Sequence, residues 1–298
     1  MSTVLQTNQL TKHFGRIKAV QELDLRIEAG QVFGILGPNG SGKTTTLGML
    51  LGVTKRTSGT FSWFEQGDGY ALRKRIGAIL EHPIFYPFLS SIENLKIAAH
   101  IKDVKNPDFD GLLKTVGLFD RRHDAYKTYS LGMKQRLAIA TSLVSDPDIL
   151  IFDEPTNGLD PQGIADIRKM IVDIAALGKT IILASHLLDE VQKVCTDFMV
   201  LKSGVKVFQG GVDEVLNQKQ RIEVYADDED ALRAALSDVR QIRSVRLEYG
   251  VLVAELNEDL SARDLNTYLF EKGIVASHLA NVRSSLEEEF LSILDEDD

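Results

Sequence analysis

Gly37-Pro38-Asn39-Gly40-Ser41-Gly42-Lys43-Thr44 matches the pattern G-x-x-x-x-G-K-[ST], in which a glycine-rich loop cradles phosphate groups. The apolar run Val32 to Leu36 precedes this loop, and a helical pattern from Lys43 to about Leu51 follows it. Backbone N–H groups of the loop and the helix N-terminus would face the phosphates. Lys43 would reach the β- and γ-phosphates, and the Thr44 hydroxyl would bind Mg²⁺. We therefore predict a strand–loop–helix site for ATP and Mg²⁺, formed by residues 37–44 and Thr45.

Two carboxylates and a histidine end the next apolar runs. Asp153 and Glu154 follow the strand-like run 149–152, and His186 follows the run 180–185. Open α/β sheets bind ligands at the carboxyl ends of their parallel strands, so these side chains should meet the loop. We expect Asp153 to hold Mg²⁺ and Glu154 to act as general base on the attacking water. His186 would contact the γ-phosphate and hold the water or the base. The alternative is a strand-end histidine that pairs with a neighbour.

Charge divides the chain into two parts. Of its 298 residues 44% are apolar and 26% are charged, which is ordinary globular usage. Residues 1–220 hold 26 Lys/Arg and 24 Asp/Glu, whereas residues 221–298 hold 8 and 19. We therefore predict two domains, 1–220 and 221–298. We expect no nucleic-acid partner, because the acidic second part would repel phosphates.

Membrane insertion, secretion and disulfide bonding find no support in the sequence. No run approaches the roughly 18 apolar residues that cross a bilayer. The first ten residues lack the basic and apolar regions of a signal peptide. The single cysteine, Cys195, excludes an internal disulfide and fits a reducing compartment.

The period of the apolar residues predicts the organisation of both domains. Strand-like and helix-like runs alternate through residues 1–220, which favours an α/β domain, and residues 84–142 form a helical insertion. After residue 221 the order is β-α-β-β-α-β and then a helix that Ser285 and Glu288 would cap. This order predicts a small α+β module of the ferredoxin-like kind. Its last strand is expected over residues 274–279.

A further motif narrows the class of nucleotide-binding protein. Ser130-Leu131-Gly132-Met133-Lys134-Gln135-Arg136 resembles the signature LSGGQ-x-Q-R of ATP-binding-cassette (ABC) ATPases. Asn157-Gly158-Leu159-Asp160 resembles their D-loop, His186 matches their switch histidine, and Phe14 matches the aromatic residue that stacks on adenine. On these motifs the chain is identified as a member of that family over residues 1 to about 220. The resemblance implies a P-loop NTPase fold with a RecA-like core, an antiparallel β subdomain and a helical subdomain.

The resemblance also implies that a lone chain carries half of each of two sites. In the family, the phosphate loop and the signature of one site belong to different subunits that face each other head to tail. Ser130 can cap the helix that starts at Leu131, so its hydroxyl and the N–H groups near Gly132 would form a second anion site. Asp160 would lie at the subunit seam. The expected partner is a second ABC ATPase chain, either a copy of this one or a paralogue.

Three residues depart from the family pattern. The signature reads Ser-Leu-Gly-Met where Ser-Gly-Gly-Gln is usual, but Ser130 and Gly132 are kept. Glu81 stands at the position of the Q-loop glutamine, where it could ligate Mg²⁺ together with Thr44 and Asp153 and would add negative charge near the γ-phosphate. Phe14 replaces the common tyrosine and keeps an aromatic face for adenine.

Residues 76–87 and the variant signature look like the ATPases of bacitracin- and lantibiotic-type exporters, and residues 221–298 look like their accessory domain. This resemblance implies an ATPase at the cytoplasmic face of the membrane that drives a separate permease, exporting peptide antibiotics, drugs, lipids or similar cargo. The alternatives are an importer ATPase and a non-transport ABC ATPase. Residues 84–89 either dock a permease helix or belong to the helical core. The acidic module could bind a ligand, help dimerise or brace the cassette.

Overall fold

The computed structural model describes residues 2–81, 84–217, 220–257, 260–283, 286–287 and 290. The chain divides into two compact units, Met1–Gly210 and Gly211–Glu296. Within the described residues, no helix is both long enough and apolar enough to cross a bilayer. The sequence position of Ser285 and Glu288, the expected cap of the last helix, lies outside the described residues.

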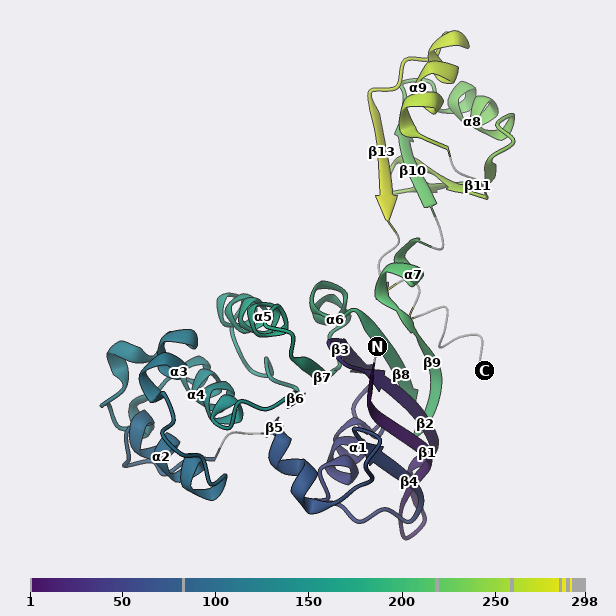
Figure 1. The fold of residues 1–298 in the computed structure, drawn as a ribbon. Coiled ribbons are helices and arrows are strands. Elements are labelled where there is room, and N and C mark those ends of the chain that lie inside the picture. The colour runs from purple at the N-terminus through teal and green to yellow at the C-terminus, as the bar shows by residue number, and fades with distance from the viewer. Residues whose placement is uncertain are drawn as a thin grey trace. The chain divides into compact units, whose positions relative to one another are not determined.

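A six-stranded sheet forms the centre of the first unit (Figure 1). Its parallel pairs are β5–β6, β6–β7, β7–β3 and β3–β8, and three of these strands are buried along their whole length. Such burial on both faces explains the continuous apolar runs of the sequence. The order across the sheet is β5 (Ile76–Ile79), β6 (Ile149–Asp153), β7 (Thr180–Ser185), β3 (Val32–Leu36), β8 (Asp197–Lys202) and β9 (Val205–Gly211).

Helices and a second sheet cover the two faces of this central sheet. Figure 1 shows α5 (Pro161–Ala175) and α6 (Leu188–Val194) on one side and α1 (Lys43–Leu50) on the other. Gly34 allows the close approach of α6, because an added Cβ would lie 2.8 Å from Val191 Cγ1. The neighbouring Phe33 and Ile35 point the opposite way, into the core that contains α1. The strand therefore alternates between its two packing partners.

The predicted antiparallel β subdomain is confirmed. It has the order β2-β1-β4, with β1 (Thr3–Phe14), β2 (Ile17–Glu28) and β4 (Ser58–Trp63). Trp63 is fully buried, and its indole N–H donates to the Leu50 carbonyl at 3.1 Å. Its role is therefore packing between this sheet and the end of α1.

The predicted helical insertion is also present. It contains α2 (Ser91–Ile101), α3 (Phe109–Thr115) and α4 (Leu131–Leu143), with short 3-10 turns at Phe119–Arg121 and Tyr126–Thr128. Another 3-10 turn, Tyr70–Arg75, leads into β5. Ser90 caps α2 in a reciprocal box with Glu93, and Ser130 caps α4 as expected.

The second unit has one four-stranded antiparallel sheet among its described residues, in the order β11-β12-β10-β13. Its elements are α7 (Val212–Asn217), β10 (Gln220–Tyr225), α8 (Glu229–Ser237), β11 (Ile242–Glu248), β12 (Val251–Leu256), α9 (Ala262–Glu271) and β13 (His278–Arg283). From β10 to β13 this is the expected β-α-β-β-α-β order, on which the ferredoxin-like assignment remains our proposal.

The last strand of this unit starts later than expected. The sequence indicated residues 274–279, whereas β13 begins at His278. The reason lies in its partner: β10 ends at Tyr225, which pairs with His278, so the preceding residues have no strand beside them. Ile274 and Ala276 still pack against the core, which gives the run its apolar pattern.

Candidate functional site

Four adjacent strands bring the predicted catalytic residues to one edge of the central sheet. The neighbours β5, β6, β7 and β3 are parallel, so their carboxyl ends lie side by side. Glu81 follows β5, Asp153 and Glu154 end or follow β6, His186 follows β7, and the phosphate loop follows β3. Residues far apart in the sequence therefore meet where such sheets bind their ligands.

The phosphate loop has a backbone that only glycine fits at two positions. Gly37 has φ +156° and Gly42 has φ +109°, and an added Cβ at either would lie 2.4 Å from a carbonyl oxygen, that of Leu201 or Ala19. Helix α1 starts directly after Gly42 and has no side-chain cap. Its first N–H groups are therefore available to an anion, and the helix dipole favours negative charge there.

Lys43 lies buried inside this loop. Its ammonium donates to the Gly37 carbonyl at 2.8 Å and to the Pro38 carbonyl at 3.3 Å. It also pairs with Glu154 Oε1 at 3.3 Å. Its side chain is only 6% exposed, so the charge has little access to water. An ammonium held this way is placed to receive phosphate oxygens.

Glu154 links the loop to His186. One carboxylate oxygen pairs with Lys43, and the other lies 2.7 Å from Nδ1 of His186. The Glu154 backbone is left-handed, with φ +49°, and its N–H donates to the Ala184 carbonyl at 2.9 Å. Strain of this kind persists where the surroundings impose it and often occurs at functional sites. The predicted base and the predicted switch histidine are therefore in direct contact.

Asp153 has the features of a metal ligand. The residue is 1% exposed, and neither carboxylate oxygen accepts a well-formed hydrogen bond. Burial raises the pKa of its carboxyl, and the charges of Glu154 and Glu81 add to the rise, whereas the Thr44 hydroxyl and Lys43 oppose it. An orphaned buried carboxylate beside a threonine hydroxyl fits Mg²⁺, which prefers one or two such ligands plus phosphate oxygens. No cage of three or more His, Cys, Asp or Glu side chains occurs among the described residues.

Asp153→Asn should stabilise the protein in the absence of metal. The pKa of the Asp153 carboxyl is raised in the folded protein. The free energy of unfolding therefore falls as pH rises above the ordinary carboxyl range, and this loss persists at neutral pH. We expect the variant to raise the thermal midpoint in EDTA at neutral pH by about 2–4 °C, the shift for about 1 kcal/mol in a domain of this size. The gain should shrink on acidification. Scanning fluorimetry with and without Mg-ATP tests this, since only the parent should gain stability from Mg²⁺. A lower midpoint than the parent in EDTA would contradict the argument.

A cavity of about 410 Å³ opens beside Lys43 and Glu154. Phe14 does not line it: this side chain is 49% exposed at the end of β1, with Lys12 Nζ 4.4 Å from its ring centre. Ile17, Lys18 and Ala19 form a wall of this cavity that the sequence did not predict. Their closeness to Phe14 in the sequence was the available signal. The lining residues are Ile17, Lys18, Ala19, Asn39, Gly40, Gly42, Lys43, Thr44, Thr45, Glu154 and Ser203.

The signature and the D-loop share a second cavity of about 380 Å³. Ser130, Gly132 and Asp160 all line it. Ser130 Oγ accepts from the Met133 N–H at 3.3 Å, and Asp160 caps α5 by accepting from the Gly163 N–H at 2.9 Å. This cavity shares no lining residue with the cavity at Lys43. Within one chain, the two groups of predicted site residues are therefore separate.

Arg136 and Asp166, which the sequence analysis did not single out as site residues, also line the signature cavity. Their side chains form an ion pair that joins α4 to α5. Both belong to helices whose caps, Ser130 and Asp160, face the same space. The available signal was their position in the sequence: Arg136 and Asp166 each lie more than one helical turn after the cap of the same helix.

Comparison with known proteins places these features in one family. The profile of the ABC transporter family matches residues 20–157. The bacitracin transport ATP-binding protein BcrA of Bacillus licheniformis is 33% identical over 99% of this chain and 98% of its own. The Nod factor export ATP-binding protein I of Cupriavidus metallidurans is 35% identical over 83% of this chain and 85% of its own. The solved structure of cbiO1 from Clostridium perfringens, part of the ABC transporter complex cbiONQ, aligns with a TM-score of 0.66 at 31% identity, covering 73% of this chain and 92% of that one.

Proposed function

Because this chain belongs to the family of ABC transporter ATP-binding proteins, we propose that it is one of two cassettes that close head to tail on two ATP molecules and drive an exporter. It is an ATPase coupled to transport. The observation that carries the dimer proposal is the separation of the two cavities, since Lys43 and Ser130 line different ones. A second chain could bring its own Ser130 to the phosphate held by Lys43.

In this proposal each residue at the sheet edge has one role. Lys43 and the N–H groups of the loop hold the β- and γ-phosphates, and the Ser130 end of the partner's α4 completes the γ-phosphate cradle. Glu154 accepts a proton from the attacking water, and His186 holds Glu154 in place. Thr44 and Asp153 would hold Mg²⁺, with Glu81 nearby, and the metal would neutralise charge on the phosphates.

The full-length match to the bacitracin ATPase favours an exporter over an importer. That relative aligns over 99% of the chain and therefore includes residues of the C-terminal unit, whereas the cbiO1 structure covers 73%. A relative named for Nod factor export supports the same direction. An importer remains the second candidate, because the cassette chemistry is the same in both. The acidic C-terminal unit disfavours a nucleic-acid partner, because its charge would repel phosphates.

We propose that a separate permease holds the chain at the cytoplasmic face of the membrane. The segment 84–89 offers one contact for it, since Ile84, Tyr86 and Phe88 are exposed by 92%, 60% and 76%. Phe85 instead packs on Tyr126 with ring centres 5.1 Å apart. The segment therefore combines a half-buried aromatic side chain with an outward apolar surface, in keeping with both interpretations that its sequence allowed.

Ser130→Arg tests the shared site. In the Glu154→Gln background, this added side chain should prevent ATP-driven dimerisation, because a bulky cation would fill the signature cavity at the subunit seam. ATP binding by the monomer should stay within about threefold of the parent, since Lys43 lies in the other cavity. Light scattering coupled to size exclusion and a nucleotide titration give the two readouts. A variant that still dimerises with ATP would contradict the head-to-tail arrangement.

Phe14→Ala tests the adenine platform. Stacking of a base on an aromatic side chain is worth about 1–3 kcal/mol, so ATP affinity should fall by roughly tenfold. Phe14→Tyr, which keeps the aromatic face, should bind as the parent does. Titration with a fluorescent ATP analogue compares the three proteins. Equal affinity for Phe14→Ala would remove Phe14 from the site.

A further inference from the structure

The turn between β8 and β9 contacts the phosphate loop from outside the motifs of the sequence. This turn consists of Ser203 and Gly204, whose backbones are left-handed with φ +50° and +82°. The Gly204 N–H donates to the carbonyl of Ser41, a residue of the phosphate loop, at 3.0 Å. Ser203 lines the cavity beside Lys43. The turn therefore touches both the loop and the space that we assign to ATP.

A second contact joins the start of the loop to the end of β8. An added Cβ at Gly37 would lie 2.4 Å from the Leu201 carbonyl oxygen, so these two backbones are in contact. β8 reaches this position because it pairs in parallel with β3, the strand that leads into the loop. The loop is therefore held at its first residue by Leu201 and at Ser41 by Gly204.

Gln21 of β2 holds this turn with two hydrogen bonds. Its backbone N–H donates to the Gly204 carbonyl at 2.8 Å, and its side-chain Nε2 donates to the Ser203 carbonyl at 3.1 Å. An added Cβ at Gly204 would lie 2.8 Å from the Lys18 carbonyl oxygen and 2.9 Å from that of Ala19, so β2 lies tightly against the turn. Substitution can remove only the side-chain bond, because the other bond uses the backbone.

The same segment of β2 also touches the phosphate loop directly. An added Cβ at Gly42 would lie 2.4 Å from the Ala19 carbonyl oxygen. Gly42 therefore contacts β2, whereas Ser41, the residue before it, contacts the turn between β8 and β9. Gln21 joins these two supports to each other. Gln21 does not line the cavity beside Lys43, so it can act on a nucleotide there only through the turn.

We propose that Gln21 is a positioning residue for ATP, which acts through Ser203 and Gly204 to keep the phosphate loop in the shape that receives the phosphates. The inference rests on the proposed function, because it assumes that the loop binds ATP, and it adds a residue that no motif indicated. A loop already held in its binding shape loses less conformational entropy when the ligand arrives. Loss of the Gln21 side-chain bond should therefore weaken ATP binding without removing any contact to the nucleotide.

Gln21→Met tests this role in the full chain, since methionine has a similar length but cannot donate a hydrogen bond. ATP affinity should fall by roughly 3- to 10-fold, the effect of one lost hydrogen bond. The hydrolysis rate at saturating ATP should stay within about twofold, because Lys43 and His186 hold the Glu154 carboxylate. Titration with a fluorescent ATP analogue and a phosphate-release assay measure the two effects. Unchanged affinity, or a loss confined to kcat, would overturn the proposal.

Hydrogen exchange of the nucleotide-free protein measures how firmly the turn is held. The Gly204 amide is bonded to the Ser41 carbonyl, so the segment around it should exchange roughly 3- to 10-fold faster in Gln21→Met. Gln21→Lys, which keeps a donor for the Ser203 carbonyl, should restore both slow exchange and ATP affinity. Restored affinity with fast exchange would mean that the added charge attracts ATP, and would refute the proposal. Exchange that is unchanged in Gln21→Met would refute it as well.

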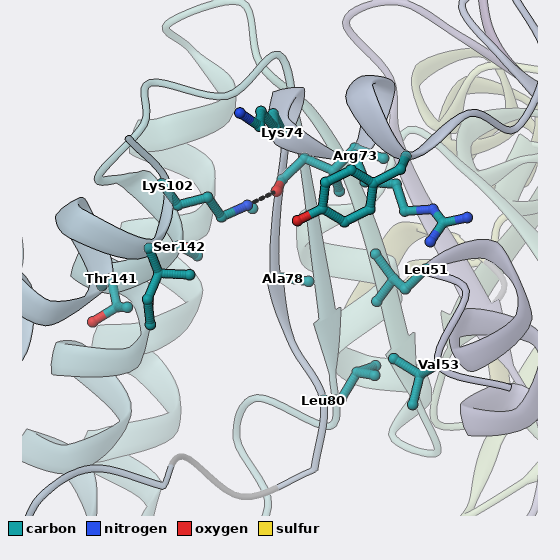
Figure 2. Close-up of a pocket in the computed structure, with 14 residues that line it drawn as sticks. Leu51, Val53, Arg73, Lys74, Ala78, Leu80, Lys102, Thr141 and Ser142 are labelled. Carbon is teal, nitrogen blue, oxygen red and sulfur yellow. Dashed lines mark hydrogen bonds between the residues drawn. The ribbon is translucent and has the colours of Figure 1, made fainter. Parts of the chain in front are cut away.

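Lys102→Met is the matched control, because it also removes a side-chain donor from a backbone carbonyl. Lys102 Nζ donates to the Ile76 carbonyl at 2.9 Å in a cavity of about 520 Å³ between α2, α4 and β5 (Figure 2). None of the residues assigned to ATP lines this cavity. The control should bind ATP as the parent does, and an equal loss in both variants would refute a specific role for Gln21. Absence of ATP binding by the parent would instead contradict the proposed function itself.

Discussion

Glu154→Gln should lower ATP hydrolysis by about 100- to 10,000-fold, the range that a positioned general base contributes. Glutamine has nearly the same shape but cannot accept a proton from water. It also leaves Lys43 without its carboxylate partner, which favours phosphate at that ammonium. ATP affinity should therefore be kept or increased, and Mg-ATP should convert the variant from monomer to a trapped dimer. A phosphate-release assay and size exclusion with light scattering measure the two effects.

Glu65→Gln is a matched control for this substitution. Glu65 also has a left-handed backbone, with φ +58°, but its side chain is exposed in the turn that follows β4. Removing a carboxylate from such a strained position should leave hydrolysis near the parent rate. If Glu154→Gln hydrolysed ATP at the parent rate, another group would have to be the base. A variant that stays monomeric yet binds ATP would indicate a different partner cassette or a required permease.

Lys43→Met should weaken Mg-ATP binding by at least about 100-fold, since hydrogen bonds to a charged group are worth about 1.5–3 kcal/mol each and Lys43 would make two to phosphate. Methionine fills much of the same buried volume without the charge. The loss should appear in the dissociation constant itself, not only in turnover. Titration of a fluorescent ATP analogue measures it directly.

Lys55→Met is the comparison for Lys43→Met, because Lys55 is an exposed lysine of the same unit. It should bind ATP as the parent does. Removal of the Lys43 ammonium also leaves the Gly37 carbonyl without its donor, so the thermal midpoint of Lys43→Met must be measured alongside. Unchanged ATP affinity in a folded Lys43→Met protein would contradict the assignment of the phosphate loop.

The central strands could be predicted from sequence because each is buried on both faces. The run Val32 to Leu36 matches β3 residue for residue, and the run that ends in Phe152 extends by one residue to the buried Asp153. Gly37 and Gly42 indicated the phosphate loop in the sequence. The structure explains why they are glycines, because close backbone contacts at both positions exclude a Cβ. The resemblance to the family identified the residues of the signature and the D-loop, Ser130, Gly132 and Asp160. The structure brings these three residues into one cavity.

Features that depend on neighbours in space could not be read in advance. The contact of Glu154 with Lys43 requires the order of the strands, which local sequence does not specify. The contact of Glu154 with His186 was expected only through the resemblance to the family. The start of β13 depends on where β10 ends.

The contact between Lys43 and Glu154 has a consequence for the order of events in the proposed mechanism. A γ-phosphate that binds this ammonium takes the position of the carboxylate, so substrate entry is an exchange of one anion for another. The displaced Glu154 keeps its contact with His186 and gains a free oxygen that can face water. Binding of the nucleotide thus frees the carboxylate that accepts a proton from the attacking water. The site is therefore prepared for hydrolysis only when nucleotide occupies it.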